Sequence, residues 1–119
     1  MMFDLIITTT LIYFLSYIVA VVLGHFFVRI ILRRYPLLKK GGLEGAGAII
    51  GIFERIFTLT LVLIGQYTAL ALILTAKSIA RFEELKNRKF AEYYLIGTLS
   101  SILFAMLIGI FTLWVLKIL

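Results

Sequence analysis

The 119-residue sequence contains no cysteine, one proline (Pro36), one histidine (His25) and one aspartate (Asp4). Without cysteine the chain cannot form disulfides, use a thiolate nucleophile or bind a metal through sulfur. A single aspartate is too few for the metal sites of CDP-alcohol-type phosphotransferases, and a single histidine is too few for a paired-histidine zinc protease. We therefore expect no metal, no cofactor and no enzymatic activity.

Charged residues are also scarce. They make up 15% of the chain, whereas hydrophobic residues make up 63% and the mean hydropathy is +1.13. Soluble domains average about 25% charged and about 45–50% apolar residues. The sequence therefore predicts an all-α integral membrane protein that forms a single domain over residues 1–119.

The apolar stretches predict four transmembrane helices, at about residues 3–32, 43–64, 67–85 and 90–119. The first stretch lacks the basic leader of a signal peptide and is too long for one, so we expect it to be retained. Only Gly65 and Gln66 separate the second helix from the third, which predicts a tight helical hairpin. Pro36 and the segment "KNRK" mark the other two turns.

The distribution of basic residues predicts the orientation. The net charge is +6, and the first and third connections contain most of the basic side chains: Arg33, Arg34, Lys39, Lys40, Lys86, Arg88 and Lys89. The positive-inside rule then predicts a multi-pass protein of the cell membrane, with these connections cytoplasmic and both termini and the hairpin tip outside.

Basic residues that flank apolar stretches are also typical of contact with the bilayer. We expect anionic lipid headgroups to bind five of them: Arg29, Arg33, Arg34, Lys39 and Lys40. The same distribution argues against nucleic-acid binding.

Two charged residues, Glu54 and Arg55, lie inside the second apolar stretch. Each charge costs about 2.5–3.5 kcal/mol at the centre of a membrane, even on the most lenient scale. Glu54 and Lys77 both lie eleven positions from the hairpin tip, which places both about 16 Å below it. We therefore expect Glu54 and Lys77 to form an ion pair near the middle of the bilayer, while Arg55 needs another partner or a water-filled space.

The same construction about the third turn, near Asn87, predicts that Arg81 pairs with Glu92 at the cytoplasmic interface. Together the predictions define an intramembrane polar cluster: Glu54, Arg55, Lys77, Arg81 and Glu92. Such a chain of ionisable groups is typical of a polar pathway, and a structural ion-pair lock would show it as well.

Small residues recur at helical spacing on two of the predicted helices. Gly47 and Gly51 form a GxxxG motif, and the last helix carries a small residue at every fourth position: Gly97, Ser101, Ala105 and Gly109. Such ridges let helix backbones approach closely in lipid. We expect some of them to mediate subunit contacts and therefore predict a homo-oligomer.

Residues 54–101 also resemble a known family. The matching pieces, in order, are Glu54-Arg55, Gly65, Ala76-Lys77-Ser78, Arg81-Phe82, Glu92-Tyr93 and Gly97-Thr98. This combination is similar to the C-terminal part of bacterial membrane proteins in the domain-of-unknown-function family numbered 3307, and it covers about 40% of the chain. The N-terminal His and Asp motif of that family has no counterpart in residues 1–45. The resemblance implies a polytopic membrane protein and no particular activity.

These patterns leave three functional hypotheses. The first is a channel or transporter in which the polar cluster forms a site or pathway for a small ion or solute. The second is a non-transporting assembly or regulatory subunit in which the charges lock the helices together. The third is a protein that binds anionic lipids through its basic rim.

Overall fold

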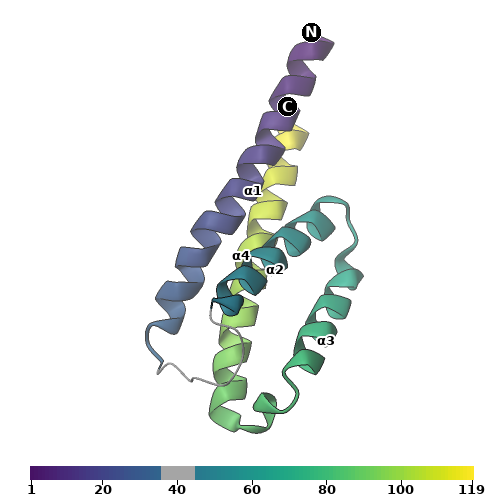
Figure 1. The fold of residues 1–119 in the computed structure, drawn as a ribbon. Coiled ribbons are helices and arrows are strands. Elements are labelled where there is room, and N and C mark those ends of the chain that lie inside the picture. Colours follow the sequence, from purple (N-terminus) through teal and green to yellow (C-terminus); the bar gives the residue numbers. More distant parts are fainter. Residues whose placement is uncertain (36–44) are drawn as a thin grey trace.

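A computed structural model describes residues 1–35 and 45–119, and the chain is helical throughout most of these ranges (Figure 1). Within these ranges the α-helices are α1 (Met2–Leu32), α2 (Ala46–Leu63), α3 (Leu70–Ala80) and α4 (Arg88–Ile118). Two short 3-10 turns, η1 (Tyr67–Ala69) and η2 (Glu84–Lys86), precede α3 and α4. The predicted break at Pro36, the start of the second helix at residue 43, and Lys39 and Lys40 lie outside the described residues.

Three of the helices, α1, α2 and α4, are long and apolar enough to cross a membrane. This confirms the all-α, membrane-type class of the protein over the described residues. The helix α3 has only 11 residues, so the prediction of four full-length spans is not confirmed.

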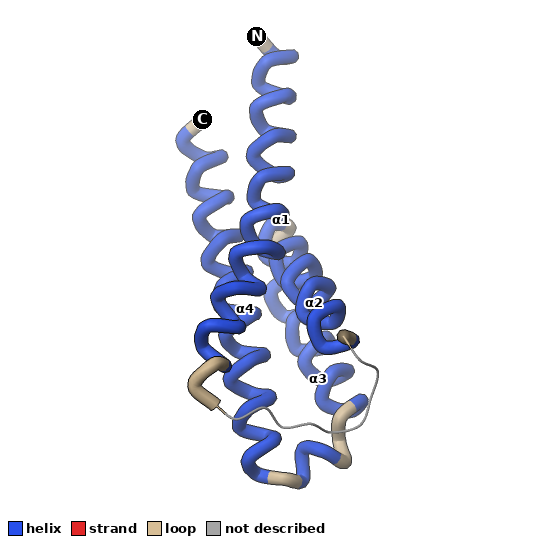
Figure 2. The backbone as a smooth tube through the Cα atoms, turned by 60° about the vertical axis from the view of Figure 1, so that its left-hand side comes forward, coloured by secondary structure: helices blue, strands red, loops and turns tan. Residues whose placement is uncertain are grey.

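The long helices α1 and α4 lie side by side and antiparallel, so that both chain termini are at the same end (Figure 1; Figure 2). Each has 31 residues and is therefore about 46 Å long. The shorter helix α2 packs against both of them, whereas its contacts with α3 are few. The predicted tight pairing of α2 with α3 is therefore not confirmed.

Small residues of α4 allow α2 to approach closely. A Cβ atom on Gly109 would lie 2.7 Å from Cγ1 of Val62 and 3.2 Å from Cδ1 of Leu59, and Ala105 is fully buried. This part of the predicted ridge therefore packs inside the chain rather than facing outward to a second subunit. A Cβ atom on Gly47, in contrast, would meet no described atom within 4 Å.

The α2–α3 tip turns part-way along α1 and α4 (Figure 1). Thr60 lies five residues before Gly65, and its Oγ1 atom is 2.6 Å from the Tyr17 hydroxyl. Because the Thr60 hydroxyl donates its own proton to the Ile56 carbonyl, Tyr17 is the donor in this bond. The helix α1 continues for another fifteen residues from Tyr17 toward the N-terminus, and it therefore projects past the tip by about 15 Å. The contact between Gly109 and Val62 gives the corresponding value for α4. Nine residues of α4 follow Gly109, whereas Gly65 lies three residues after Val62, so α4 projects past the tip by about 9 Å.

The third helix ends at Ala80, five residues earlier than predicted. Arg81 leaves the helical conformation (φ −116°, ψ 24°), and its N–H bonds to the Ser78 carbonyl in a tighter turn. The next helix starts at Arg88 because the side chain of Asn87 accepts a hydrogen bond from the Phe90 N–H, as an N-cap residue does. The reversal therefore occupies residues 81–87, a segment that the sequence pattern assigns largely to helix.

Candidate functional site: a cationic groove within the helices

A groove of about 1480 Å³ runs between α2 and α3, and residues of α1 and α4 complete its walls. It exceeds the 300–1,000 Å³ of ordinary ligand pockets. Six of the described lining residues are basic: His25, Arg29, Arg33, Arg55, Lys77 and Arg81. Glu54 is the one acidic residue among the described residues that line it. The groove is therefore strongly cationic and lies inside a bundle of apolar helices.

The ion pair between Glu54 and Lys77 joins α2 to α3 across this groove. Lys77 Nζ lies 2.7 Å from Glu54 Oε2, as the equal distance of the two residues from the hairpin tip predicts. The Glu54 side chain is 3% exposed and the Lys77 side chain 21%. Lys77 also donates to the Thr98 hydroxyl of α4 and lies 4.8 Å from the centroid of the Tyr94 ring. One ammonium group therefore connects three helices.

Arg55 is 2% exposed and is only partly satisfied. Its Nη1 donates to the Ser101 hydroxyl on α4 at 3.3 Å. Within the described residues, its Nε and Nη2 atoms are buried and have no hydrogen-bond partner. The polar cluster is thus not a closed set of pairs, because two N–H groups of a buried cation are left over.

Two glycines make room for the Arg55 side chain. A Cβ atom on Gly24 of α1 would lie 2.5 Å from Arg55 Cδ and 3.0 Å from Nε, and one on Gly51 would lie 3.2 Å from Nη1. Gly51 belongs to the predicted packing motif, whereas Gly24 is missed by the sequence reasoning. Its signal is a series of small residues at four-residue spacing in the first helix, Ser16, Ala20 and Gly24, all of which are buried.

The predicted pairing of Arg81 with Glu92 is wrong. Glu92 is exposed and accepts a hydrogen bond at 2.9 Å from Nε of Arg88, one turn earlier on the same helix. Arg81 instead lies with Cζ 5.7 Å from the centroid of the Phe90 ring and lines the groove. The prediction fails because it assumes two helices that continue to the turn, whereas the chain leaves α3 at Ala80.

The described residues that were predicted to contact lipid headgroups, Arg29, Arg33 and Arg34, are all exposed. Arg29 and Arg33 also line the groove together with His25, although the sequence predicts only contact with headgroups for these two arginines. Gly97, which was predicted to mediate packing, also lines the groove and faces Leu32, since a Cβ atom there would lie 3.3 Å from Leu32 Cδ1.

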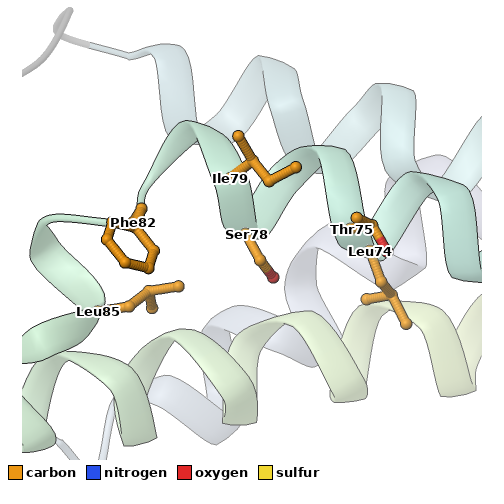
Figure 3. A pocket seen from close by; sticks show the side chains of 6 residues that line it. All are labelled: Leu74, Thr75, Ser78, Ile79, Phe82 and Leu85. Atoms are coloured by element: carbon orange, nitrogen blue, oxygen red, sulfur yellow. The ribbon is translucent and has the colours of Figure 1, made fainter.

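A second, smaller hollow of about 330 Å³ lies between α3 and the turn that follows it (Figure 3). Its six lining residues are Leu74, Thr75, Ser78, Ile79, Phe82 and Leu85. They offer two hydroxyl groups and no charge, so this hollow has little chemistry with which to fix a ligand. The cationic groove is therefore the better candidate for a functional site.

No known protein family matches the chain, and no curated protein or solved structure is similar to it. The resemblance of residues 54–101 to the family numbered 3307 therefore stays a prediction. What the groove does has to be inferred from its geometry.

Proposed function

We propose that this protein is a small multi-pass membrane protein in which the cationic groove is a polar site or pathway for a small ion or solute, as in a channel or transporter. The observation that carries the proposal is Arg55, a buried cation at the groove wall with two N–H groups that no described residue satisfies. A buried polar group without a partner costs about 1–3 kcal/mol, and a charged one costs more.

This observation favours a ligand site over a purely structural lock. In a lock, every buried charge has a partner, as Glu54 and Lys77 do. Arg55 stabilises little through its single 3.3 Å bond to Ser101, and an apolar residue of similar length would fill the same space at lower cost. A charge kept under these conditions is typical of a functional intramembrane residue.

We further propose that α2 and α3 cross the bilayer with the tip at its outer interface, that the termini lie outside and that the basic connections are cytoplasmic. Three exposed Tyr and Trp side chains lie near the level of the tip, as interfacial belts do: Tyr13, one turn beyond Tyr17, Trp114, five residues beyond Gly109, and Tyr67 at the tip itself. A tip inside the hydrocarbon would present the non-helical turn and the exposed Gln66 side chain to lipid, which is unfavourable.

Cysteine labelling tests this topology, since the chain has no cysteine of its own. Gln66→Cys is preferable to a change at Gly65, whose φ of 75° suits glycine. We expect an impermeant maleimide to label Gln66→Cys from outside and Lys86→Cys only from the cytoplasmic side. A tip that reacts from neither side would show that α2 and α3 turn within the bilayer, and labelling of both positions from one side would overturn the proposed crossing.

Flux through proteoliposomes tests the function. We expect purified protein to raise the permeability to at least one of K⁺, H⁺, Cl⁻ or phosphate above that of empty vesicles. Arg55→Met should abolish this flux, whereas Arg88→Met, which removes an exposed cation outside the groove, should leave it unchanged. Equal flux in the two variants would exclude the groove as the pathway.

A further inference from the structure

The charge of the groove indicates the class of its ligand. Five cationic side chains, Arg29, Arg33, Arg55, Lys77 and Arg81, face one carboxylate, so that the described lining has a formal excess of four positive charges even with His25 neutral. Glu54 is already paired with Lys77 and does not offset the others. Arg29 and Arg33 are exposed, but Arg55, Lys77 and Arg81 are at least partly buried beside apolar walls that screen charges poorly, so this excess favours an anion in the groove.

Arg55 indicates the shape of that anion. Its two unpartnered atoms, Nε and Nη2, are the donors on one edge of the guanidinium, while Nη1 on the other side is bonded to Ser101. Two parallel N–H groups on one edge match two oxygens of the same phosphate or carboxylate group. The free edge of Arg55 is therefore a bidentate oxyanion donor without an acceptor among the described residues.

We propose that the groove binds a phosphate group, which Arg55 holds through its Nε and Nη2 edge and which the cationic rim neutralises. This assignment rests on the proposed function, because it names the ligand of the same groove. A phosphate monoester has a charge of about −1.5 to −2 near neutral pH, which suits an excess of several cations better than the single charge of a carboxylate does.

Binding requires the Arg55 side chain to turn, because its Nε and Nη2 atoms are buried. Gly24 and Gly51 are packed against the buried side chain, since a Cβ atom on Gly24 would lie 2.5 Å from Arg55 Cδ and one on Gly51 would lie 3.2 Å from Nη1. Gly24→Ala should therefore displace Arg55 from this position.

Thermal unfolding of the full chain in mild detergent tests the phosphate site. The probes are inorganic phosphate, potassium chloride at the same ionic strength, and dioctanoyl phosphatidic acid, a short-chain lipid with a phosphate monoester headgroup. We expect one phosphate probe to raise the unfolding temperature of the wild type and of Lys117→Met, whose lost cation is outside the groove. Arg55→Met should remove this shift, and Arg81→Met should weaken binding at least tenfold.

Arg55→Met is expected to fold, because it replaces a partly unsatisfied buried cation with an apolar side chain of similar length. If it does not fold, the comparison of Arg81→Met with Lys117→Met answers the same question. Since phosphate stabilises proteins in general as a kosmotrope, only the difference between variants counts as binding.

The two probes distinguish the source of the phosphate. Stabilisation by inorganic phosphate supports a free phosphate or phosphorylated solute, whereas stabilisation by phosphatidic acid alone supports a lipid headgroup. Equal shifts in the wild type, Arg55→Met and Arg81→Met overturn the phosphate assignment. Flux without any phosphate effect overturns this assignment alone, and phosphate binding without flux overturns only the proposed pathway.

Discussion

The ion pair between Glu54 and Lys77 provides the sharpest test of the structure, because its two partners differ in burial. Lys77→Met leaves the Glu54 carboxylate, 3% exposed, without the hydrogen bond that Lys77 donates. Glu54→Gln leaves an ammonium that is 21% exposed and retains the Thr98 hydroxyl and the Tyr94 ring. The two single substitutions should therefore not cost the same.

Breaking a buried pair from one side typically costs about 3–5 kcal/mol, and we expect this range for Lys77→Met. For Glu54→Gln we expect about 1–3 kcal/mol, since the remaining cation keeps a neutral partner and some access to solvent. The double variant leaves no orphan charge and should recover about 1–3 kcal/mol of the summed losses, which is the usual range for residues in contact.

The free energy of unfolding in detergent or bicelles measures these four states. The matched control is the pair of Arg88 and Glu92, which also forms a salt bridge at 2.9 Å but has side chains that are 93% and 62% exposed. Its coupling should be at most about 0.5 kcal/mol, because solvent screens exposed pairs one turn apart. If the stability losses of Glu54→Gln and Lys77→Met simply add in the double variant, the two side chains do not touch in the folded protein. If Glu54→Gln costs more than Lys77→Met, the reasoning from burial is refuted.

The same double variant separates the two leading functional hypotheses when its flux is measured. A structural lock predicts a stable protein with unchanged function, because only the fold needs the pair. A polar pathway predicts a stable protein that has lost its flux, because the ionisable groups take part themselves.

Two further substitutions test the packing of α2. Gly109→Ala should destabilise the fold by about 1–3 kcal/mol, because its Cβ would lie 2.7 Å from Val62, whereas Gly47→Ala, which meets no described atom, should be neutral or slightly stabilising. Denaturation of the two variants in the same detergent checks this, and equal effects would show that Gly109 is not at a close contact. Tyr17→Phe should cost about 0.5–1.5 kcal/mol through loss of the Thr60 bond, and an unchanged unfolding free energy would show that this bond adds nothing in lipid.

The sequence was sufficient to predict the Glu54–Lys77 contact, because that prediction needed only a turn at Gly65 and Gln66 and equal rise along two helices. It was insufficient for Arg81 and Glu92, where the same reasoning assumed that α3 continues to the turn. The end of α3 at Ala80 depends on the tight turn at Arg81 and on the Asn87 cap, which compete locally with a sequence that is otherwise compatible with a helix.

The packing partners of the small residues could not be predicted for a different reason. A ridge such as Ser101, Ala105 and Gly109 shows that something approaches closely, but not whether it is a second subunit or another helix of the same chain. Gly24 shows the same limit. It belongs to a ridge of Ser16, Ala20 and Gly24 on α1, which indicates a close neighbour, but only the three-dimensional arrangement shows that Arg55 lies against it.

The unequal lengths of the helices have a consequence for the surrounding bilayer. The helices α1 and α4 each present about 46 Å of mostly apolar surface. The α2–α3 tip stops about 15 Å short of the end of α1 and about 9 Å short of the end of α4. Lipids beside α1 and α4 must therefore stretch, or the helices must tilt, while lipids beside the tip have to match a shorter apolar surface. A protein of this shape would be surrounded by a membrane of uneven thickness and would be sorted toward bilayers thick enough to cover its longer side.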